Sequence, residues 1–159
     1  MSINNPKETT IRALIVNKNN NKILTCYYKK YKTYMTAGGH KENNESDIDT
    51  ISRELYEELG ATNVKIIKYL KSLYTPTDDT LSRYYLVDID KVDLKHRALE
   101  KGEVEDGLQV VWQDLEEIIR NNKQQYYNAL YEGLGLPYII KREIVFFKSL
   151  KEVLWKNIY

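Results

Sequence analysis

The sequence predicts an α+β fold in which helices cover both faces of a mixed β-sheet, an α/β/α sandwich. β-rich segments and amphipathic helical segments are interspersed along the 159 residues. No internal repeat, low-complexity tract or long linker divides them. We therefore expect one domain over residues 1–159, a length sufficient to bury a hydrophobic core.

The first part of the chain predicts three strands. β-branched and aromatic residues are concentrated there between polar segments typical of turns. The expected elements are a strand at Thr10–Asn17, a turn at Lys18–Asn21, a strand at Lys22–Tyr28 and a short strand at Tyr31–Thr36. The first two strands should form a hairpin, and Ala37-Gly38-Gly39 should end the third before a polar loop that runs to Glu45.

The segment Ser46–Leu59 predicts the first helix. Ser46 is a residue type that caps helix N-termini, and Asp47 and Asp49 follow in the first turn, where the helix dipole favours anions. Gly60 stands where a left-handed C-terminal cap is expected. Apolar residues spaced three and four apart form one stripe that faces the core: Ile48, Ile51, Leu55 and Leu59.

The remaining chain predicts three more strands and two more helices. The strands are expected at Asn63–Tyr74, Arg83–Asp90 and Gln109–Trp112, with loops at 75–82 and at Lys95–Leu108. A second helix should run from an Asp114 cap to about Tyr131, and residues 133–137 should separate it from a third helix at about residues 138–156.

The third helix has a broad apolar side. Its members are Ile140, Ile144, Phe147, Leu150 and Leu154. This side either buries against the sheet or forms a homodimer interface. We also expect Trp112 and Trp155 to pack in the core.

Bulk composition favours an ordinary globular protein. Hydrophobic residues make up 42% and charged residues 30% of the sequence, and the formal net charge is +1. These values argue against a disordered chain and against a dedicated nucleic-acid binder. The only cysteine, Cys26, lies in an apolar run, so no internal disulfide can form. Because no apolar run reaches the roughly 18 residues of a membrane span and no signal-peptide core is evident, we expect a cytoplasmic protein with no membrane partner.

Three glutamates crowd the last turns of the predicted first helix. Glu54, Glu57 and Glu58 fall on one side of it, next to the apolar stripe. Each like-charge pair at i,i+3 or i,i+4 costs roughly 0.2–0.5 kcal/mol, and the dipole opposes negative charge at this end. A bound cation removes the repulsion, and all-oxygen ligands favour Mg²⁺ or Mn²⁺ over zinc. The alternative is a solvated acidic face, partly neutralised by Arg53 and nearby lysines.

A longer motif surrounds these glutamates. The chain contains Gly39, five residues, Glu45, seven residues, Arg53-Glu54-Leu55, one residue, Glu57-Glu58, one residue, Gly60 and Ala61. This pattern resembles the signature of the Nudix hydrolases, the MutT-like family. The resemblance implies the Nudix sandwich fold and a pyrophosphohydrolase with Mg²⁺ (or Mn²⁺) as cofactor. Such an enzyme cleaves a nucleoside diphosphate linked to another moiety, a small nucleotide or nucleotide conjugate, by water attack on phosphorus.

The resemblance also implies roles for residues of the motif. Glu54, Glu57 and Glu58 are candidate metal ligands, together with the Gly39 backbone carbonyl. Glu54 is a candidate general base, Glu57 helps to position water or a second ion, and Arg53 orients the carboxylates. The catalytic candidates are therefore Arg53, Glu54 and Glu57.

Further substrate contacts are expected from glycines and arginines. Gly38 and Gly39 permit a close backbone approach, although Ala37 stands where many relatives have proline. Arg12 and Arg83 are candidates to bind phosphate, which suits the guanidinium; each is otherwise a surface charge. A base outside the motif often comes from a later loop, and the candidates are Glu100, Glu103 and Glu105. Tyrosines on or near the strands pack in the sheet or stack on a base: Tyr28, Tyr34, Tyr74, Tyr84 and Tyr85.

Two other functions stay open. A non-catalytic Nudix-fold module senses a nucleotide without cleaving it, but such modules usually have lost motif carboxylates, and this chain keeps them all. An RNA 5′-end pyrophosphohydrolase binds nucleic acid, which the near-neutral charge disfavours. The sequence does not distinguish oxidised nucleoside triphosphates, nucleotide sugars, ADP-ribose and dinucleoside polyphosphates as substrates.

Overall fold

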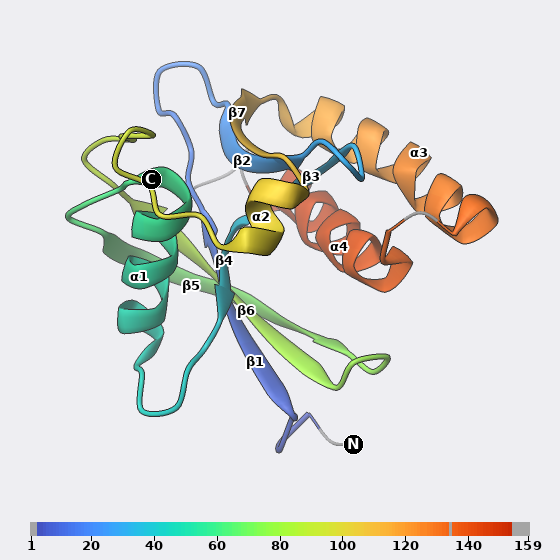
Figure 1. Ribbon diagram of the computed structural model, residues 1–159, viewed down its shortest axis with the longest axis horizontal. Helices are drawn as coiled ribbons and strands as arrows, with labels where there is room; N and C mark the ends of the chain where they lie inside the picture. Colours follow the sequence, from blue (N-terminus) through green and yellow to red (C-terminus); the bar gives the residue numbers. More distant parts are fainter. Residues whose placement is uncertain (1–2, 134, 154–159) are drawn as a thin grey trace.

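The computed structural model describes residues 3–133 and 135–153. The strands in this part are β1 (Glu8–Leu14), β2 (Ile23–Tyr28), β3 (Thr33–Met35), β4 (Ala37–His40), β5 (Lys65–Thr75), β6 (Thr80–Asp88) and β7 (Leu108–Gln113). The helices are α1 (Asp47–Leu59), α2 (Lys101–Glu105), α3 (Leu115–Glu132) and α4 (Pro137–Val153). Figure 1 shows α1 on one side of the strands and α3 with α4 on the other, which confirms the predicted sandwich.

The strands form two sheets. In the first, with the order β4-β1-β6-β5, β1 pairs in parallel with β6, whereas the other pairs are antiparallel. In the second, β2 lies between β3 and β7, and both pairs are antiparallel. The first sheet is therefore mixed, as predicted.

Side chains of β1 alternate between the two faces of the sheet and so belong to two core clusters. Ile11 and Ala13 are fully buried in the cluster that contains Leu55 of α1. Leu14 belongs to the second cluster, with Phe146 of α4. Because successive side chains of a strand point to opposite faces, β1 joins both helical layers to the sheet, and burial of these side chains is the main source of stability.

α1 agrees closely with its prediction. Ser46 is the N-cap, and its side chain and that of Asp49 form a reciprocal capping box. Gly60 has a φ of 63°, the left-handed conformation of a helix C-cap. The prediction for Ile48 is wrong, since it is 39% exposed; it stands in the first turn, and complete burial along the helix begins at Thr50.

Three predictions about turns and loops are only partly right. The hairpin predicted around residues 18–21 is limited to an antiparallel bridge from Val16 to Ile23 and its flanking backbone hydrogen bonds, because β1 and β2 belong to different sheets. β3 ends at Met35, before Ala37-Gly38-Gly39, but these three residues form part of another strand, β4, which pairs with β1. The segment 95–108 is not entirely loop, since it contains α2.

α4 buries its apolar side against the sheet. Phe146 stacks on Tyr84 of β6 with ring centroids 3.9 Å apart, and both residues are fully buried. Trp112 is 38% exposed, so its predicted core position is wrong; it lies near the end of β7, an edge strand. The positions predicted for Leu154, Trp155 and residue 156 lie outside the described residues, and the homodimer stays a prediction.

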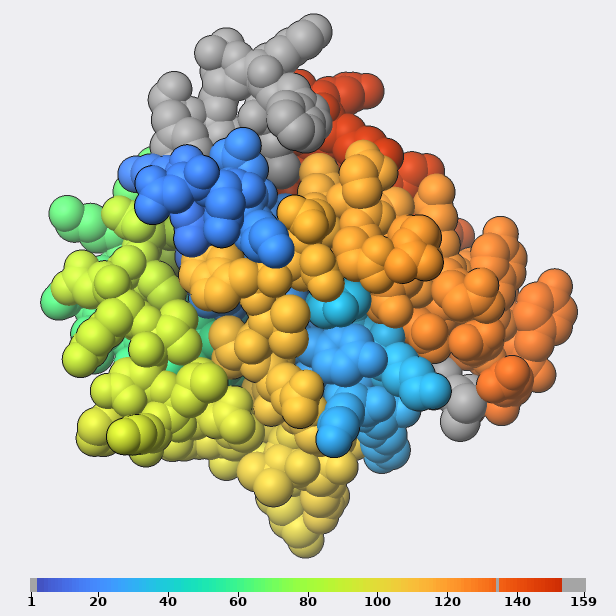
Figure 2. Space-filling view, turned by 90° about the horizontal axis from the view of Figure 1, so that it is seen from above, coloured from blue at the N-terminus to red at the C-terminus, as the bar shows by residue number. Residues whose placement is uncertain are grey.

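α3 is joined to the β2–β3 hairpin by a buried amide. The Asn122 side chain donates to the Tyr34 carbonyl at 2.7 Å and accepts from the Tyr34 N–H at 3.0 Å. In Figure 2 the orange surface of α3 lies directly against the blue surface of this hairpin. Among the described residues, no helix has the length and hydrophobicity that crossing a lipid bilayer requires.

We expect Phe146→Ala to lower the free energy of unfolding by about 3–5 kcal/mol, because it empties a fully buried position and removes the stacked contact with Tyr84. Val145→Ala, at the neighbouring 43% exposed position, should cost about 0.5 kcal/mol or less. Urea unfolding followed by circular dichroism measures both changes. Equal losses in the two variants would contradict the placement of α4.

Candidate active site

A buried glutamate of α1 is joined to the glycine pair of β4. Glu58 is 1% exposed, and its carboxylate accepts a 2.8 Å hydrogen bond from the Gly38 N–H. The Cys26 sulfur lies 3.7 Å from the same oxygen. The Glu58 carboxylate is therefore surrounded by protein rather than by water.

The two glycines allow this close approach. Gly38 has a φ of 119°, and a Cβ there would lie 2.1 Å from the Ile11 carbonyl oxygen. A Cβ on Gly39 would lie 2.6 Å from the Glu54 carboxylate. Glu54 thus packs directly on the β4 backbone, one helical turn from Glu58; Gly38 has no room for a side chain, and a side chain on Gly39 would displace the Glu54 carboxylate.

Arg53 connects several parts of the motif. Its Nε donates to Glu45 at 2.8 Å, and its Nη1 donates to Glu54 at 2.8 Å and to Glu57 at 3.3 Å. Its Nη2 donates to the His40 carbonyl at 2.9 Å. Arg53 and Glu57 are spaced i,i+4 on α1, so their contact follows from the helix geometry. One guanidinium therefore positions three carboxylates relative to the end of β4.

The carboxylates differ in acidity because their surroundings differ. Burial raises the pKa of Glu58 to about 8, although the charge of Arg12 and a backbone N–H oppose the change. Burial also raises the pKa of Glu54, against the hydrogen bond and charge of Arg53. For Glu45 the hydrogen bonds from Arg53 lower the pKa to about 2. The site therefore combines a weakly acidic carboxyl group with one that is ionised at neutral pH.

Glu54 and Glu58 line a cleft of about 310 Å³ together with Gly38 and Gly39. α2 also contributes to its lining, and so does α4 on the other side of the sheet. Glu57 lies next to the cleft through its contact with Arg53 but does not line it. The cleft therefore lies between the motif residues of β4 and α1 and residues of α2 and α4.

α2 brings two of the later acidic candidates to the cleft. Glu100 and Glu103 both line it, and burial raises the pKa of Glu103. The Glu105 side chain is 63% exposed and lies 3.8 Å from Lys101. The structure therefore places Glu100 and Glu103 with the motif and turns Glu105 away.

Arg12 lines the cleft, but its side chain donates hydrogen bonds to the backbone carbonyls of Thr36 and Gly38. It is 6% exposed, so the alternative of a surface charge is wrong. Its nitrogens donate to the Thr36 hydroxyl at 3.1 Å, to the Thr36 carbonyl, and to the Gly38 carbonyl at 2.5 Å. The Glu143 carboxylate of α4 lies 3.7 Å away and balances its charge. Most donors of Arg12 are thus occupied by the protein itself.

Arg83 lies on the opposite face of the sheet from Arg12. In the parallel register of β1 and β6, Arg12 pairs with Tyr84 and Ile11 pairs with Arg83, and neighbouring side chains alternate between faces. Arg83 donates to Asp47 at the start of α1 at 3.1 Å and does not line the cleft. The structure therefore does not bring this candidate together with the motif glutamates.

Among the cleft residues that the sequence does not mark are Met35, Ile139 and Arg142. Tyr28, one of the tyrosines considered for base stacking, lines the cleft as well. No local pattern marks Ile139 or Arg142, because only the packing of α4 on the sheet brings them near α1.

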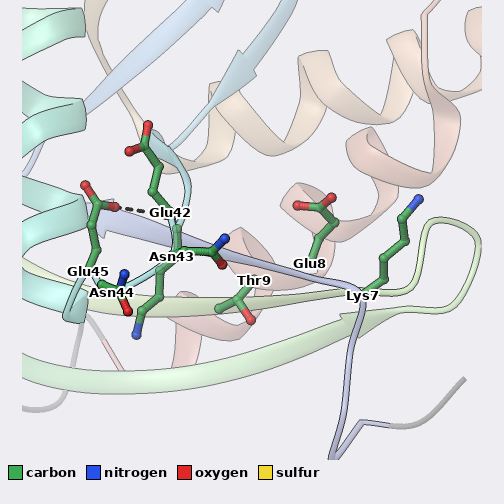
Figure 3. Close-up of a pocket in the computed structure, with 8 residues that line it drawn as sticks. Lys7, Glu8, Thr9, Glu42, Asn43, Asn44 and Glu45 are labelled. Carbon is green, nitrogen blue, oxygen red and sulfur yellow. Dashed lines mark hydrogen bonds between the residues drawn. The ribbon is translucent and has the colours of Figure 1, made fainter.

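A second, more open hollow of about 810 Å³ lies beside the motif loop. Figure 3 shows Lys7, Glu8 and Thr9 along the start of β1, facing residues 42–45 of the loop. The Glu42 N–H donates to the Glu45 carboxylate at 3.0 Å in this loop. Because the glutamates of α1 do not line this hollow, the smaller cleft is the candidate active site.

Known proteins share this fold. The family model of the NUDIX domain matches residues 6–132. The chain belongs to the Nudix family. The family match ends before α4, so this helix is a part of the cleft that the family model does not cover.

Solved structures at low identity share the Nudix fold. A NUDIX hydrolase from Nitrosomonas europaea has 16% identity and a TM-score of 0.60, with 98% of both chains covered. The E. coli ORF135 protein has 19% identity and a TM-score of 0.58, with 94% of both chains covered. An ADP-ribose pyrophosphatase from Streptococcus suis has 14% identity and a TM-score of 0.59, with 96% of this chain and 94% of that chain covered. No curated protein sequence matches the chain.

The acidic residues of the Nudix motif are not arranged as a closed metal cage. Within residues 3–133 and 135–153, no group of three or more His, Cys, Asp or Glu side chains is placed to hold an ion. Glu54 and Glu57 contact Arg53 instead, and Glu58 contacts the Gly38 N–H. Each of these contacts uses one carboxylate oxygen, so the second oxygen of each glutamate stays available to a cation.

Glu58 should make the metal-free protein less stable as the pH rises. Its pKa of about 8 in the folded protein lies above the value of about 4.3 expected for an unfolded glutamate. Between these values the unfolded chain binds fewer protons, so the free energy of unfolding falls as the pH rises. We expect Glu58→Gln to flatten this dependence in thermal unfolding measured in EDTA from about pH 5 to about pH 8. Glu132→Gln, an exposed position on α3, should retain the slope of the wild type; identical slopes in all three proteins would count against the buried, protonated Glu58.

Proposed function

We propose that the cleft catalyses metal-dependent hydrolysis of a nucleoside diphosphate linked to another moiety, a nucleotide or nucleotide conjugate, by water attack on phosphorus. One observation carries this proposal: Glu54 and Glu58 pack against the Gly38–Gly39 backbone and line the same cleft. This packing supports a site at which carboxylate and backbone oxygens act together on a cation. The ADP-ribose pyrophosphatase among the structural neighbours carries out a reaction of the same class.

The donor set suits a hard cation. The Gly39 carbonyl, Glu54, Glu57 and Glu58 offer only oxygen atoms, which favours Mg²⁺, with Mn²⁺ as the alternative. Mg²⁺ keeps several waters and needs only one or two carboxylates, so the lack of a closed cage is compatible with it. The bound ion supplies neutralisation of phosphate charge and a water of lowered pKa.

The protein groups have different tasks because their acidities differ. Glu58 has to lose its proton before it can act as a ligand, since burial raises its pKa to about 8. Glu54 is the leading candidate for the general base, because a raised pKa improves proton acceptance. Glu57 positions water or a second ion, and Arg53 orients it through their 3.3 Å contact. Glu103, which lines the cleft, is a second candidate for the base.

We further propose that residues 1–159 act as one Nudix domain in a reducing compartment such as the cytoplasm. Cys26 is a free, buried thiol, which is typical of proteins in reducing surroundings.

Glu57→Gln and Glu58→Gln should each reduce kcat by roughly 10²–10⁴-fold, because the amide keeps the shape of the side chain and removes its charge and basicity. The assay follows release of phosphate or pyrophosphate in Mg²⁺ over a panel of oxidised nucleoside triphosphates, nucleotide sugars, ADP-ribose and dinucleoside polyphosphates. Chromatography identifies the products and so the substrate. Glu132→Gln is the matched control, with the same chemical change at an exposed position.

The outcomes of this assay separate the candidate functions. Unchanged rates in both site variants would refute the catalytic assignment. Tight nucleotide binding without turnover in any metal would favour a sensing module. RNA binding that weakens strongly as the salt concentration rises would favour an RNA 5′-end pyrophosphohydrolase.

Mg²⁺ should raise the thermal midpoint of the wild type in a concentration-dependent manner, since a ligand that binds only the folded state stabilises it. EDTA should abolish turnover. The same titration of Glu58→Gln should give little or no rise, and Glu132→Gln should respond like the wild type. A wild type that is insensitive to millimolar Mg²⁺ and Mn²⁺, with and without nucleotide, would contradict metal dependence.

A further inference from the structure

Two neighbouring charged residues of α4 are buried beside the cleft, beyond the segment that the NUDIX domain model matches. Arg142 is 8% exposed and Glu143 is fully buried. Burial of a charge costs free energy unless the charge is paired and hydrogen-bonded. Each of these residues therefore requires partners, either within the protein or in a ligand.

Glu143 finds its partners within the protein. Its carboxylate oxygens accept from the Thr36 hydroxyl at 3.1 and 3.2 Å, and the Arg12 guanidinium lies 3.7 Å away. Thr36 directly precedes β4, so Glu143 fastens α4 to the strand that carries the motif glycines. These contacts account for Glu143 as a structural residue.

Arg142 is only partly satisfied. Its Nη2 donates to Glu143 at 3.0 Å, and its guanidinium interacts with the Tyr84 hydroxyl, which is buried beside it. Its Nη1 makes no hydrogen bond within the part of the chain that the structure describes. Buried polar groups in native proteins are rarely left unpaired. Nη1 is therefore the donor of Arg142 that points to a ligand in the cleft.

The place of Arg142 indicates which ligand. Arg142 lines the cleft together with Glu54, and so does Ile139, one turn earlier on the same side of α4. The other arginines of the cleft are occupied, Arg12 by backbone carbonyls and Arg53 by motif glutamates. Arg142 is thus the arginine of the cleft with unused donors, in surroundings rich in carboxylates that would otherwise repel an anion.

We propose that Arg142 binds the diphosphate of the substrate and anchors it in the cleft, a role that rests on the proposed function. The planar guanidinium forms charge-assisted, paired hydrogen bonds with phosphate oxygens. Because the diphosphate is common to every substrate of this class, Arg142 contributes to affinity for all of them and does not select the base. The anchor comes from α4, whereas the catalytic carboxylates come from α1.

The test compares Arg142→Met with the wild type. Methionine keeps the apolar stem and removes the charge and the donors. Calorimetry with inorganic pyrophosphate in MgCl₂ measures binding without a base, and steady-state kinetics uses the best nucleotide of the panel. We expect the Kd for pyrophosphate and the KM to rise roughly 10- to 100-fold, as for loss of a hydrogen bond to a charged group, with a much smaller change in kcat.

Three controls separate anchoring from structural support. Lys141→Met removes the same charge from the exposed neighbouring position and should leave Kd and KM within about twofold of the wild type. Arg142→Lys keeps the charge beside Glu143 but lacks the paired donors, so it should fold and show an intermediate loss of affinity. The rise of the thermal midpoint with Mg²⁺ alone should be the same in all variants, because Arg142 is not a metal ligand.

The results distinguish the anchoring role from the proposed function. A folded Arg142→Met with the Kd and KM of the wild type would overturn the anchoring role, as would Arg142→Lys with wild-type affinity if Arg142→Met does not fold. A lower thermal midpoint with unchanged pyrophosphate affinity would show that Arg142 only supports Glu143. A wild type that binds pyrophosphate through Arg142 but cleaves no nucleotide would contradict the proposed function and support the anchor.

Discussion

The contact between the β4 glycines and α1 is the constraint on which the candidate site depends. Glu58 accepts the Gly38 N–H where little water reaches it, and the Glu54 carboxylate occupies the space that a side chain on Gly39 would need. A carboxyl group in such a place resists ionisation because burial disfavours its charged form. The crowding of glutamates on α1, unfavourable for an isolated helix, is therefore tied to a backbone geometry that requires glycine at position 38 and to the space that Gly39 leaves for Glu54.

Three arginines show how position decides what one residue type does. Arg12 is buried in the sheet and holds backbone carbonyls of residues 36 and 38. Arg53, on α1, holds the motif carboxylates. Arg142, on α4, donates to Glu143 through Nη2 and keeps an Nη1 that no described residue engages. Glu143 contacts the first and the last of these, so one buried charge network joins α4 to the sheet, and loss of a single partner leaves an uncompensated charge.

Predictions from the sequence agree with the structure where the contacts join residues close in the chain, and they fail where the contacts join distant residues. α1 was predictable with its cap, its apolar stripe and the contact from Arg53 to Glu57, because all of these depend on residues within one or two turns. The pairing of β1 was not, since its partners β4 and β6 are separated from it by loops and helices, and the nearby β2 joins another sheet. Arg83 was grouped with Arg12 on residue type alone, and the strand register then placed them on opposite faces.

The sequence by itself determined the spacing of the Nudix motif, and with it the family, the element that carries the glutamates and the oxygen-rich donor set. These properties are local, because residues spaced three or four positions apart lie on the same side of a helix. Only the tertiary structure decided that Glu58 is buried, that Arg12 serves the backbone and that α4 brings Arg142 to the cleft. These outcomes depend on contacts between distant positions, such as Thr36 and Glu143, which are 107 residues apart, and no local pattern encodes such a contact.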